Sequence, residues 1–289
     1  MARQHWVGGT ASDARRPEAI LRMCEQATLL DPDYAQAWAL MALAKAELKF
    51  WYGKDSNALP AAERALSLNP EAPEALVVKA QYLEEEGHQD EADRHIDRAL
   101  KADPESWEVN REAARMLFRQ GRISEAIPFF EKAASLMDSD YHNSAMLQCC
   151  YNSLGDEANR LRVARMTLER AERALAQNPT DSSAAAFAAS CLAIFGDTQR
   201  ARELIQRALL LDPDSHGLRY NLACALLVDV GDAEAALEVI TPFFERVESP
   251  GHIKHFEADP DFDSIRDDPR FKQLLASAKE RLGMAAAAE

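Results

Sequence analysis

Three observations predict an all-α fold for this chain, a solenoid of stacked helix-turn-helix hairpins. Its 289 residues are 47% apolar and 28% charged, a composition that suits a folded chain with a large core. Apolar residues recur with helical spacing over most of the length. Landmark residues recur every 34 residues, a period that is typical of helical repeats. Such intervals run from Pro70 to Pro104, Gly87 to Gly121, Gly121 to Gly155, Ala92 to Ala126 and Pro179 to Pro213.

The first two hairpins depart from this period. The first, which ends at Pro32, is degenerate, because MARQHWVGG begins with helical character and lacks an N-cap. Pro70 follows Pro32 by 38 residues, so we expect four extra residues in the turn KFWYGKDSNALP. There Phe50, Trp51 and Tyr52 form either an exposed aromatic anchor for a partner or packing against the first hairpin.

The third and fourth hairpins keep the period, and the fifth is longer. Asp138 takes the place of the closing proline of the fourth hairpin, and Pro179 follows it by 41 residues. The seven extra residues correspond to about two helical turns. The helix DEANRLRVARMTLERAERALAQ can therefore lengthen without rotating its buried face.

The sixth hairpin is regular, and the seventh, YNLACALLVDVGDAEAALEVITPFFERV, is atypical. Residues 1–248 thus form about seven hairpins, with the first and last atypical and the second and fifth lengthened. Residues 249–289 break the pattern and are expected to be a C-terminal capping segment and tail, because the end of a solenoid needs a polar cover.

Each landmark has a physical role. Alanine is needed where two helices of a hairpin cross closely, glycine supplies the left-handed turn between them, and proline ends the second helix. The crossing positions hold Ala92, Ala126 and Ala201, the second small position holds Ala27, Ala65, Ala99, Ala133, Ala174 and Ala208, and Phe130 lies between them in the most regular copy.

This pattern resembles the tetratricopeptide-repeat (TPR) family over nearly the whole chain. The resemblance implies a right-handed superhelix whose concave groove is lined by the first helix of each hairpin. The segments DPDYAQAW and RYNLACAL and the tail also resemble the C-terminal TPR region, of end-of-group type, of bacterial adenylate cyclase-like and winged-helix signalling proteins. That implies a regulatory module of a larger protein or a free-standing relative, and the abrupt start at Met1 favours the former.

Charge and composition restrict the partners and the compartment. The net charge of −15 repels phosphate backbones and anionic lipid surfaces, so neither nucleic acid nor a membrane is an expected partner. There is no signal peptide or span-length apolar segment, which predicts a cytoplasmic protein. Five cysteines without a CxxC pair are interpreted as small buried side chains in a reducing compartment: Cys24, Cys149, Cys150, Cys191 and Cys224.

The first candidate site is a cationic stripe in the fourth repeat. Arg111, Arg115 and Arg119 lie at i, i+4 and i+8, hence on one helix face. They suit an acidic peptide or a C-terminal carboxylate held by bidentate bonds. The alternative, which we favour, is pairing with neighbours such as Glu108 and Glu112.

Further groove positions are filled by Gln81, Phe187, Tyr220 and Asn221. The two amides can both donate to and accept from a peptide backbone. Tyr220 suits partner binding and inter-repeat packing equally well, and Phe187 lies on the small-residue helix SAAAFAASCLAIF, where burial is the favoured interpretation.

The sequence offers no catalytic, cofactor or metal motif, and we expect a protein that is not an enzyme. His252 and His255 lie near Asp259, Asp261 and Asp263, but Ser264 and Arg270 stand where a calcium loop starting at Asp259 needs Gly and Glu. A capping turn explains this segment better.

The leading hypothesis is therefore a protein-interaction scaffold that binds a peptide or helix of a partner in the concave groove. The alternatives are the regulatory module described above and an assembly protein that self-associates through the ends of its solenoid.

Overall fold

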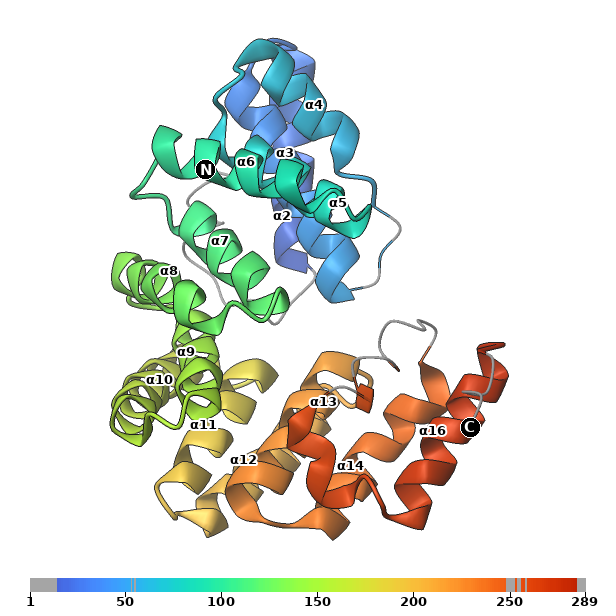
Figure 1. Ribbon diagram of the computed structural model, residues 1–289. Coiled ribbons are helices and arrows are strands. Elements are labelled where there is room, and N and C mark those ends of the chain that lie inside the picture. The colour runs from blue at the N-terminus through green and yellow to red at the C-terminus, as the bar shows by residue number, and fades with distance from the viewer. Residues whose placement is uncertain are drawn as a thin grey trace. The chain divides into compact units, whose positions relative to one another are not determined.

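The computed structural model describes residues 15–52, 54, 56–247, 253, 256–257 and 259–284 (Figure 1). Within these ranges every regular element is a helix and none is a strand. The chain divides into two compact units, residues 1–166 and 167–289, and the division falls inside helix α10 (Glu157–Gln177).

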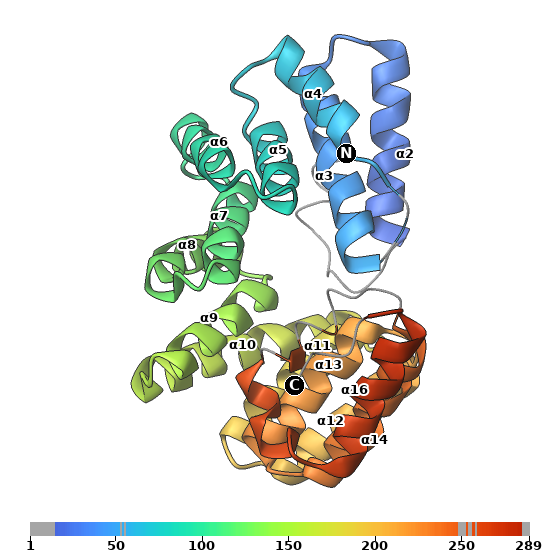
Figure 2. The same ribbon diagram turned by 45° about the vertical axis from the view of Figure 1, so that its right-hand side comes forward.

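Unit 1 consists of helices that pack in consecutive pairs. The pairs α3/α4, α5/α6 and α7/α8 are hairpins, and α2 packs against α3 (Figure 2). The hairpin expected before Pro32 is represented by α2 alone, because its other half lies outside the described residues. The elements are α2 (Arg15–Leu30), α3 (Ala35–Tyr52), α4 (Leu59–Leu68), α5 (Pro73–Glu85), α6 (Gln89–Ala102), α7 (Trp107–Arg119), α8 (Ile123–Leu136), α9 (Tyr141–Ser153) and the first part of α10.

Unit 2 continues in the same way and ends in the C-terminal segment. Helices α11 and α12 form one hairpin and α13 packs against α14, while α16 lies along α14 and η2 contacts η1 (Figure 1). The elements after α10 are α11 (Ser182–Ile194), α12 (Thr198–Leu211), α13 (His216–Cys224), the π-helix η1 (Ala225–Val230), α14 (Ala233–Arg246), the 3₁₀-helix η2 (Pro260–Ile265) and α16 (Pro269–Arg281).

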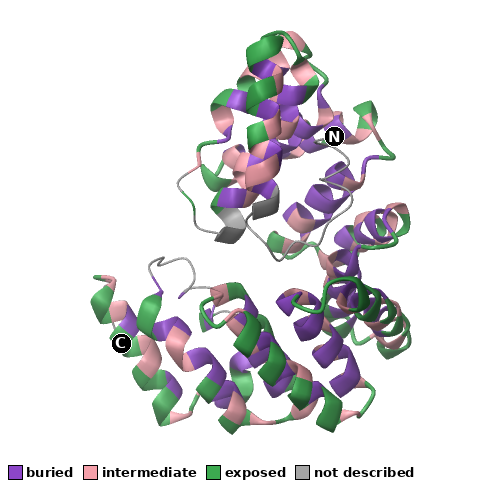
Figure 3. Cartoon of the chain, turned by 180° about the vertical axis from the view of Figure 1, so that it is seen from behind, coloured by how far each residue is buried: buried purple, intermediate pink, exposed green. Residues whose placement is uncertain are grey.

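The landmark residues do what the period predicts. Gly121 turns the chain between α7 and α8 with φ +74°, a conformation that costs a residue with a Cβ about 1–2 kcal/mol. The crossing alanines and Phe130 are completely buried. Ala27, in the atypical first repeat, is only half-buried. Buried residues follow one side of second helices such as α6 and α12, whereas the first helices α7 and α11 are buried over most of their residues, and exposed residues gather on the outer helices and the turns (Figure 3).

A contact that the sequence did not reveal joins three of the repeats to the repeat before them. Arg64 of α4 donates to the carbonyl oxygen of Pro32 over 3.2 Å and pairs with Asp33. Arg98 of α6, 34 residues later, makes the same bond to Pro70 over 2.7 Å. Arg207 repeats it with Pro179 in unit 2. The closing proline thus supplies an acceptor for the following repeat as well as ending its own helix.

Two helices depart from the regular lengths. Helix α10 has 21 residues, seven more than the 14 of α6, α8 and α12. In the last repeat, Gly231 follows Pro213 by 18 residues, one more than the 17 that separate Pro179 from Gly196. The extra residue is accommodated in η1, because a π-turn is an α-helix that has taken in one additional residue.

Candidate functional site

Three of the four predicted residues of unit 1 meet around one carboxylate. Glu112 on α7 accepts a hydrogen bond from Gln81 Nε2 of α5 at its Oε2 (2.7 Å). Its Oε1 accepts from Arg111 Nε (2.9 Å) and lies 3.4 Å from an Arg115 guanidinium nitrogen. We call Gln81, Arg111, Glu112 and Arg115 the polar network. The network links two successive first helices through a side chain that is only 4% exposed.

Burial and charge act against each other within this network. Burial raises the pKa of Glu112, but the positive charges of Arg111, Arg115 and Arg119 and the hydrogen bond from Gln81 outweigh it and lower this pKa from 4.5 to about 2. Burial and the like charge of Arg111 lower the pKa of Arg115 to about 10. Both groups therefore remain ionised at neutral pH.

The network extends to a third first helix through Trp107. The guanidinium carbon of Arg111 lies 4.5 Å from the centroid of the Trp107 ring. The indole Nε1 donates to Asp140 Oδ2 (2.7 Å), and Asp140 caps α9 by accepting from the backbone nitrogens of His142 and Asn143. Three consecutive repeats are thereby connected by polar contacts, so these side chains are held in fixed positions.

The three arginines of the stripe have different environments. Arg111 and Arg115 have side chains only 9% and 13% exposed and pair with Glu112, as the pairing interpretation expects. Arg119 is 37% exposed and pairs with Glu84 of α5. Glu108, the other predicted partner, accepts a hydrogen bond from Ser106 Oγ, and its charge is among those that raise the pKa of Arg111. Arg119 is therefore the arginine of the stripe whose side chain is most exposed to a partner.

The pH dependence of stability provides a test of this electrostatic balance. Because the folded-state pKa of Glu112 is depressed, its ionised form stabilises the fold above pH 4.5, and this contribution is lost as the pH falls towards 2. Over that window we expect the free energy of unfolding to fall by roughly 3 kcal/mol more in the wild type than in a Glu112→Gln variant. Urea titrations at several pH values measure this difference, and parallel curves for the two proteins would contradict it.

The predicted residues of unit 2 do not form an open site together. Phe187 is half-buried on α11, most of which is buried, and Asn221 is exposed on α13. The Tyr220 ring lies 5.3 Å from that of Phe256 and 5.9 Å from that of Phe262, and its hydroxyl donates to Asp259. Tyr220 therefore packs against the C-terminal segment, an arrangement that neither sequence interpretation included.

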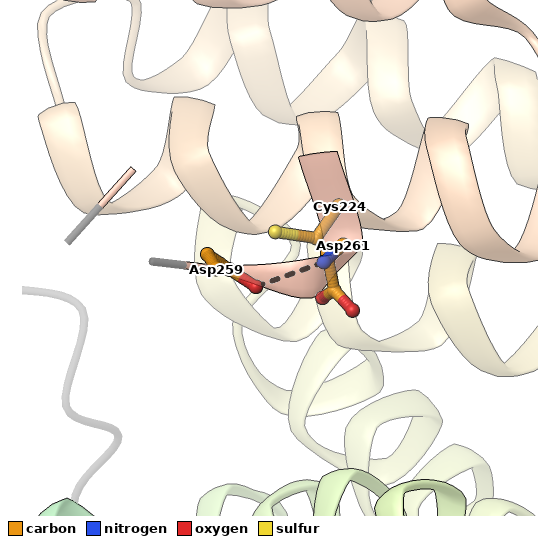
Figure 4. Close-up of side chains that lie close together, drawn as sticks. All are labelled: Cys224, Asp259 and Asp261. Atoms are coloured by element: carbon orange, nitrogen blue, oxygen red, sulfur yellow. Dashed lines mark hydrogen bonds between the residues drawn. The ribbon is translucent and has the colours of Figure 1, made fainter. Parts of the chain in front are cut away.

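One group of side chains has metal-binding chemistry. The thiol of Cys224 and the carboxylates of Asp259 and Asp261 lie within 4.8 Å of one another (Figure 4). Asp259 already caps η2 by accepting from the Asp261 backbone nitrogen, and it also accepts from the Tyr220 hydroxyl. The cap formed by Asp259 agrees with the interpretation of this segment as a capping turn, an interpretation that did not include Cys224. His252 and His255 lie outside the described residues.

The remaining candidates are the cysteines, the aromatic turn and the apolar segments. Cys24, Cys150 and Cys191 are buried as interpreted, but Cys224 is only half-buried. Cys149 is exposed, because it occupies the outer side of α9 where its neighbour Cys150 faces the core. The side chains of Phe50, Trp51 and Tyr52 lie outside the described part of the structure. No helix in the described part has the length and apolar character needed to cross a bilayer.

Sequence reasoning missed the residues that organise the network. The helical spacing gives Glu112 only as an alternative partner of the stripe and does not single out Trp107 or Asp140. A signal was present in WEVNREAARM, where charged residues interrupt a helix whose apolar residues are too few to cover its buried faces. Charges in that position need partners from neighbouring helices.

Comparison with known proteins supports the repeat pattern. A family model for the tetratricopeptide repeat matches residues 79–140 and 157–216. No curated protein sequence matches the chain.

Solved structures with similar folds include a human IFIT1 dimer with m7Gppp-AAAA (18% identity, TM-score 0.61), covering 96% of this chain and 66% of that one. A human IFIT1 dimer with PPP-AAAA has 19% identity and TM-score 0.58, covering 94% and 62%. The APC/C hetero-tetramer Cut9–Hcn1 has 19% identity and TM-score 0.58, covering 96% and 54%. The chain thus spans less than two thirds of the length of these proteins, and at such identities the likeness concerns the fold. The chain contains tetratricopeptide repeats and has the all-helical fold of TPR solenoids.

Proposed function

We propose that the chain is a protein-interaction scaffold that binds a peptide or helix of a partner along the first helices of its hairpins. The polar network carries this proposal. Gln81 and Arg115 remain partly exposed, while the buried Glu112 holds both in place. Donors fixed in advance lose little conformational entropy when a ligand binds, which favours recognition of backbone carbonyls or carboxylates. No enzymatic activity is part of the proposal.

An acidic segment or a C-terminal carboxylate is the partner chemistry that suits these donors. Arg119 is the arginine of the stripe with most exposed surface, and Glu84 occupies part of its hydrogen-bonding capacity. A Lys–Asn clamp of the type known in some TPR proteins is disfavoured, because the matching positions of the second and third repeats carry Ala39, Leu43, Val77 and Gln81.

Reversing the charge of Arg119 tests the acidic-partner proposal. We expect Arg119→Glu to reduce recovery of partners from a lysate of the source organism at least tenfold, measured by pull-down and mass spectrometry, because an acidic segment would then meet a repulsive charge. Arg122→Glu is the matched control, since Arg122 is similarly exposed and also paired with an acid. Equal recovery with wild type and Arg119→Glu would contradict the proposal. Arg111 and Arg115 are left unchanged, because their side chains are only 9% and 13% exposed and pair with the buried Glu112.

Nucleic acid remains an unexpected partner in this proposal. The human IFIT1 structures with PPP-AAAA and m7Gppp-AAAA show that a related fold can hold such ligands, so the fold alone does not exclude them. The net charge of −15 and the pairing of the stripe arginines with acids support a protein partner for this chain. The pull-down eluates are therefore also probed for RNA, whose specific enrichment would favour the other class of ligand.

The finer resemblance to bacterial cyclase-like and winged-helix regulators supports a regulatory role as a second proposal, in the cytoplasm of a bacterial cell. It rests on the motifs in the sequence, and the reading frame upstream of Met1 tests it. Self-association through a solenoid end is less well supported at the C-terminal side, because α16 exposes polar residues there: Lys272, Gln273, Ser277 and Glu280. Light scattering coupled to size exclusion determines the oligomeric state.

A further inference from the structure

The C-terminal segment covers the first helix of the last repeat. We call residues 256–265 the strap, of which all but residue 258 are described. Tyr220 and Cys224 are four residues apart on α13 and share one face. The strap contacts both of them through the rings of Phe256 and Phe262, the Asp259 carboxylate near both side chains, and the nearby Asp261.

Tyr220 and Cys224 occupy groove positions of the repeat. Tyr220 follows Pro213 by seven residues, as Arg111 follows Pro104, and Cys224 follows Pro213 by eleven, as Arg115 follows Pro104. The strap therefore lies on the positions that carry the polar network in the fourth repeat. In that repeat Arg111 and Arg115 pair with Glu112, which also accepts a hydrogen bond from Gln81 of the preceding first helix.

The strap contacts Tyr220 as a bound peptide could, and its rings also pack in the core of unit 2, where Phe256 lies 4.8 Å from Phe243 and from Phe244. The two phenylalanines of the strap are six residues apart, with Asp259 midway between them. Both phenylalanine rings contact the Tyr220 ring, while the Asp259 carboxylate accepts a hydrogen bond from the Tyr220 hydroxyl. Both phenylalanine side chains are at most 1% exposed. Arg266 fixes the backbone by donating to the carbonyl oxygens of Glu257 and Asp259, each over 2.7 Å.

We propose that the strap is an intramolecular occupant that closes the groove face of the last repeat to partners. A segment tethered nearby acts at an effective concentration on the order of millimolar. A partner peptide at micromolar concentration that made the same contacts would be outcompeted about a thousandfold. This inference rests on the proposed function and restricts it, because partner binding is then confined to the first helices that precede α13.

A peptide with the strap's own sequence is the probe. Fluorescein-labelled IKHFEADPDFDSIR, residues 253–266, is titrated with the full chain and followed by fluorescence anisotropy. We expect no binding to the wild type up to about 100 µM, since the tethered strap is present at about millimolar effective concentration. A loosened variant, Asp259→Ala with Phe262→Leu, should bind the peptide at least tenfold more tightly than the wild type. Adding Tyr220→Phe to it should weaken binding about tenfold, because a hydrogen bond to a charged group is lost.

Three results would overturn the proposal. Equal binding of the peptide to wild type and loosened variant would show that the face is open. A loosened variant that is folded by circular dichroism and does not bind would show that the strap is only a structural cap. If that variant does not fold, hydrogen exchange of the unaltered chain decides, with amides of 259–265 expected to be as protected as those of α14. If the amides of the strap exchanged as fast as those of exposed turns, the strap would not close the groove face of the last repeat. No external partner is used, so the outcome is independent of the Arg119 test.

Discussion

Replacing Glu112 by glutamine is expected to lower the free energy of unfolding by about 3–5 kcal/mol. The variant keeps the shape of the side chain but removes the charge that compensates two buried guanidinium groups. Breaking a buried ion pair from one side leaves the other charge without compensation, which costs far more than the pair itself contributes. Urea-induced unfolding followed by circular dichroism measures the change.

The matched control is Glu63→Gln. Glu63 is 56% exposed and pairs with Lys79 over 2.9 Å, so water replaces most of what the pair provides. We expect a change within about 1 kcal/mol. If the two variants were equally stable, the polar network would contribute no more than an ordinary surface ion pair.

Truncation of Phe130 to alanine should destabilise unit 1 by about 3–5 kcal/mol. The side chain is completely buried between α7 and the neighbouring helices, and its ring meets that of Phe118 edge-on at 6.4 Å. Removing it leaves a cavity that the surrounding helices cannot fill. Denaturant unfolding combined with hydrogen exchange localises the loss, which should be concentrated in α7, α8 and α9.

Phe129→Ala is the control for this prediction. Phe129 is the adjacent residue of the same type on α8, but it is only partly buried. The substitution Phe129→Ala removes the same atoms as Phe130→Ala, but less apolar area is lost from the core. We therefore expect roughly half the decrease in the free energy of unfolding. A larger loss for Phe129→Ala than for Phe130→Ala would show that the periodic landmark position does not organise the repeat.

Periodic features of the fold could be predicted because each has a local cause. The interval from Gly87 to Gly121 locates two left-handed turns, and the crossing alanines mark the positions where helices touch. The long interval before Pro179 predicts the length of α10 in the same way. These features depend on residues within a single hairpin, so one sequence is enough to infer them.

The site was less predictable, since it depends on contacts between hairpins. Helical spacing places Arg111, Arg115 and Arg119 on one face, but it does not state which of them the neighbouring repeat buries. Gln81 reaches Glu112 from 31 residues away, and Tyr220 meets Asp259 from 39 away. No periodicity within the sequence encodes these pairings.

The π-helix η1 also shows how one repeat can hold a residue more than its neighbours. One additional codon in a 34-residue repeat would normally rotate every later side chain by about 100° and misplace the second helix of its hairpin. The wide turn confines the disturbance to Ala225–Val230, so α14 still packs against α13. It also directs Asp229 towards Ser190, whose hydroxyl donates to it over 2.9 Å. A repeat array can thus acquire a new inter-repeat contact at its last member without altering the register of the others.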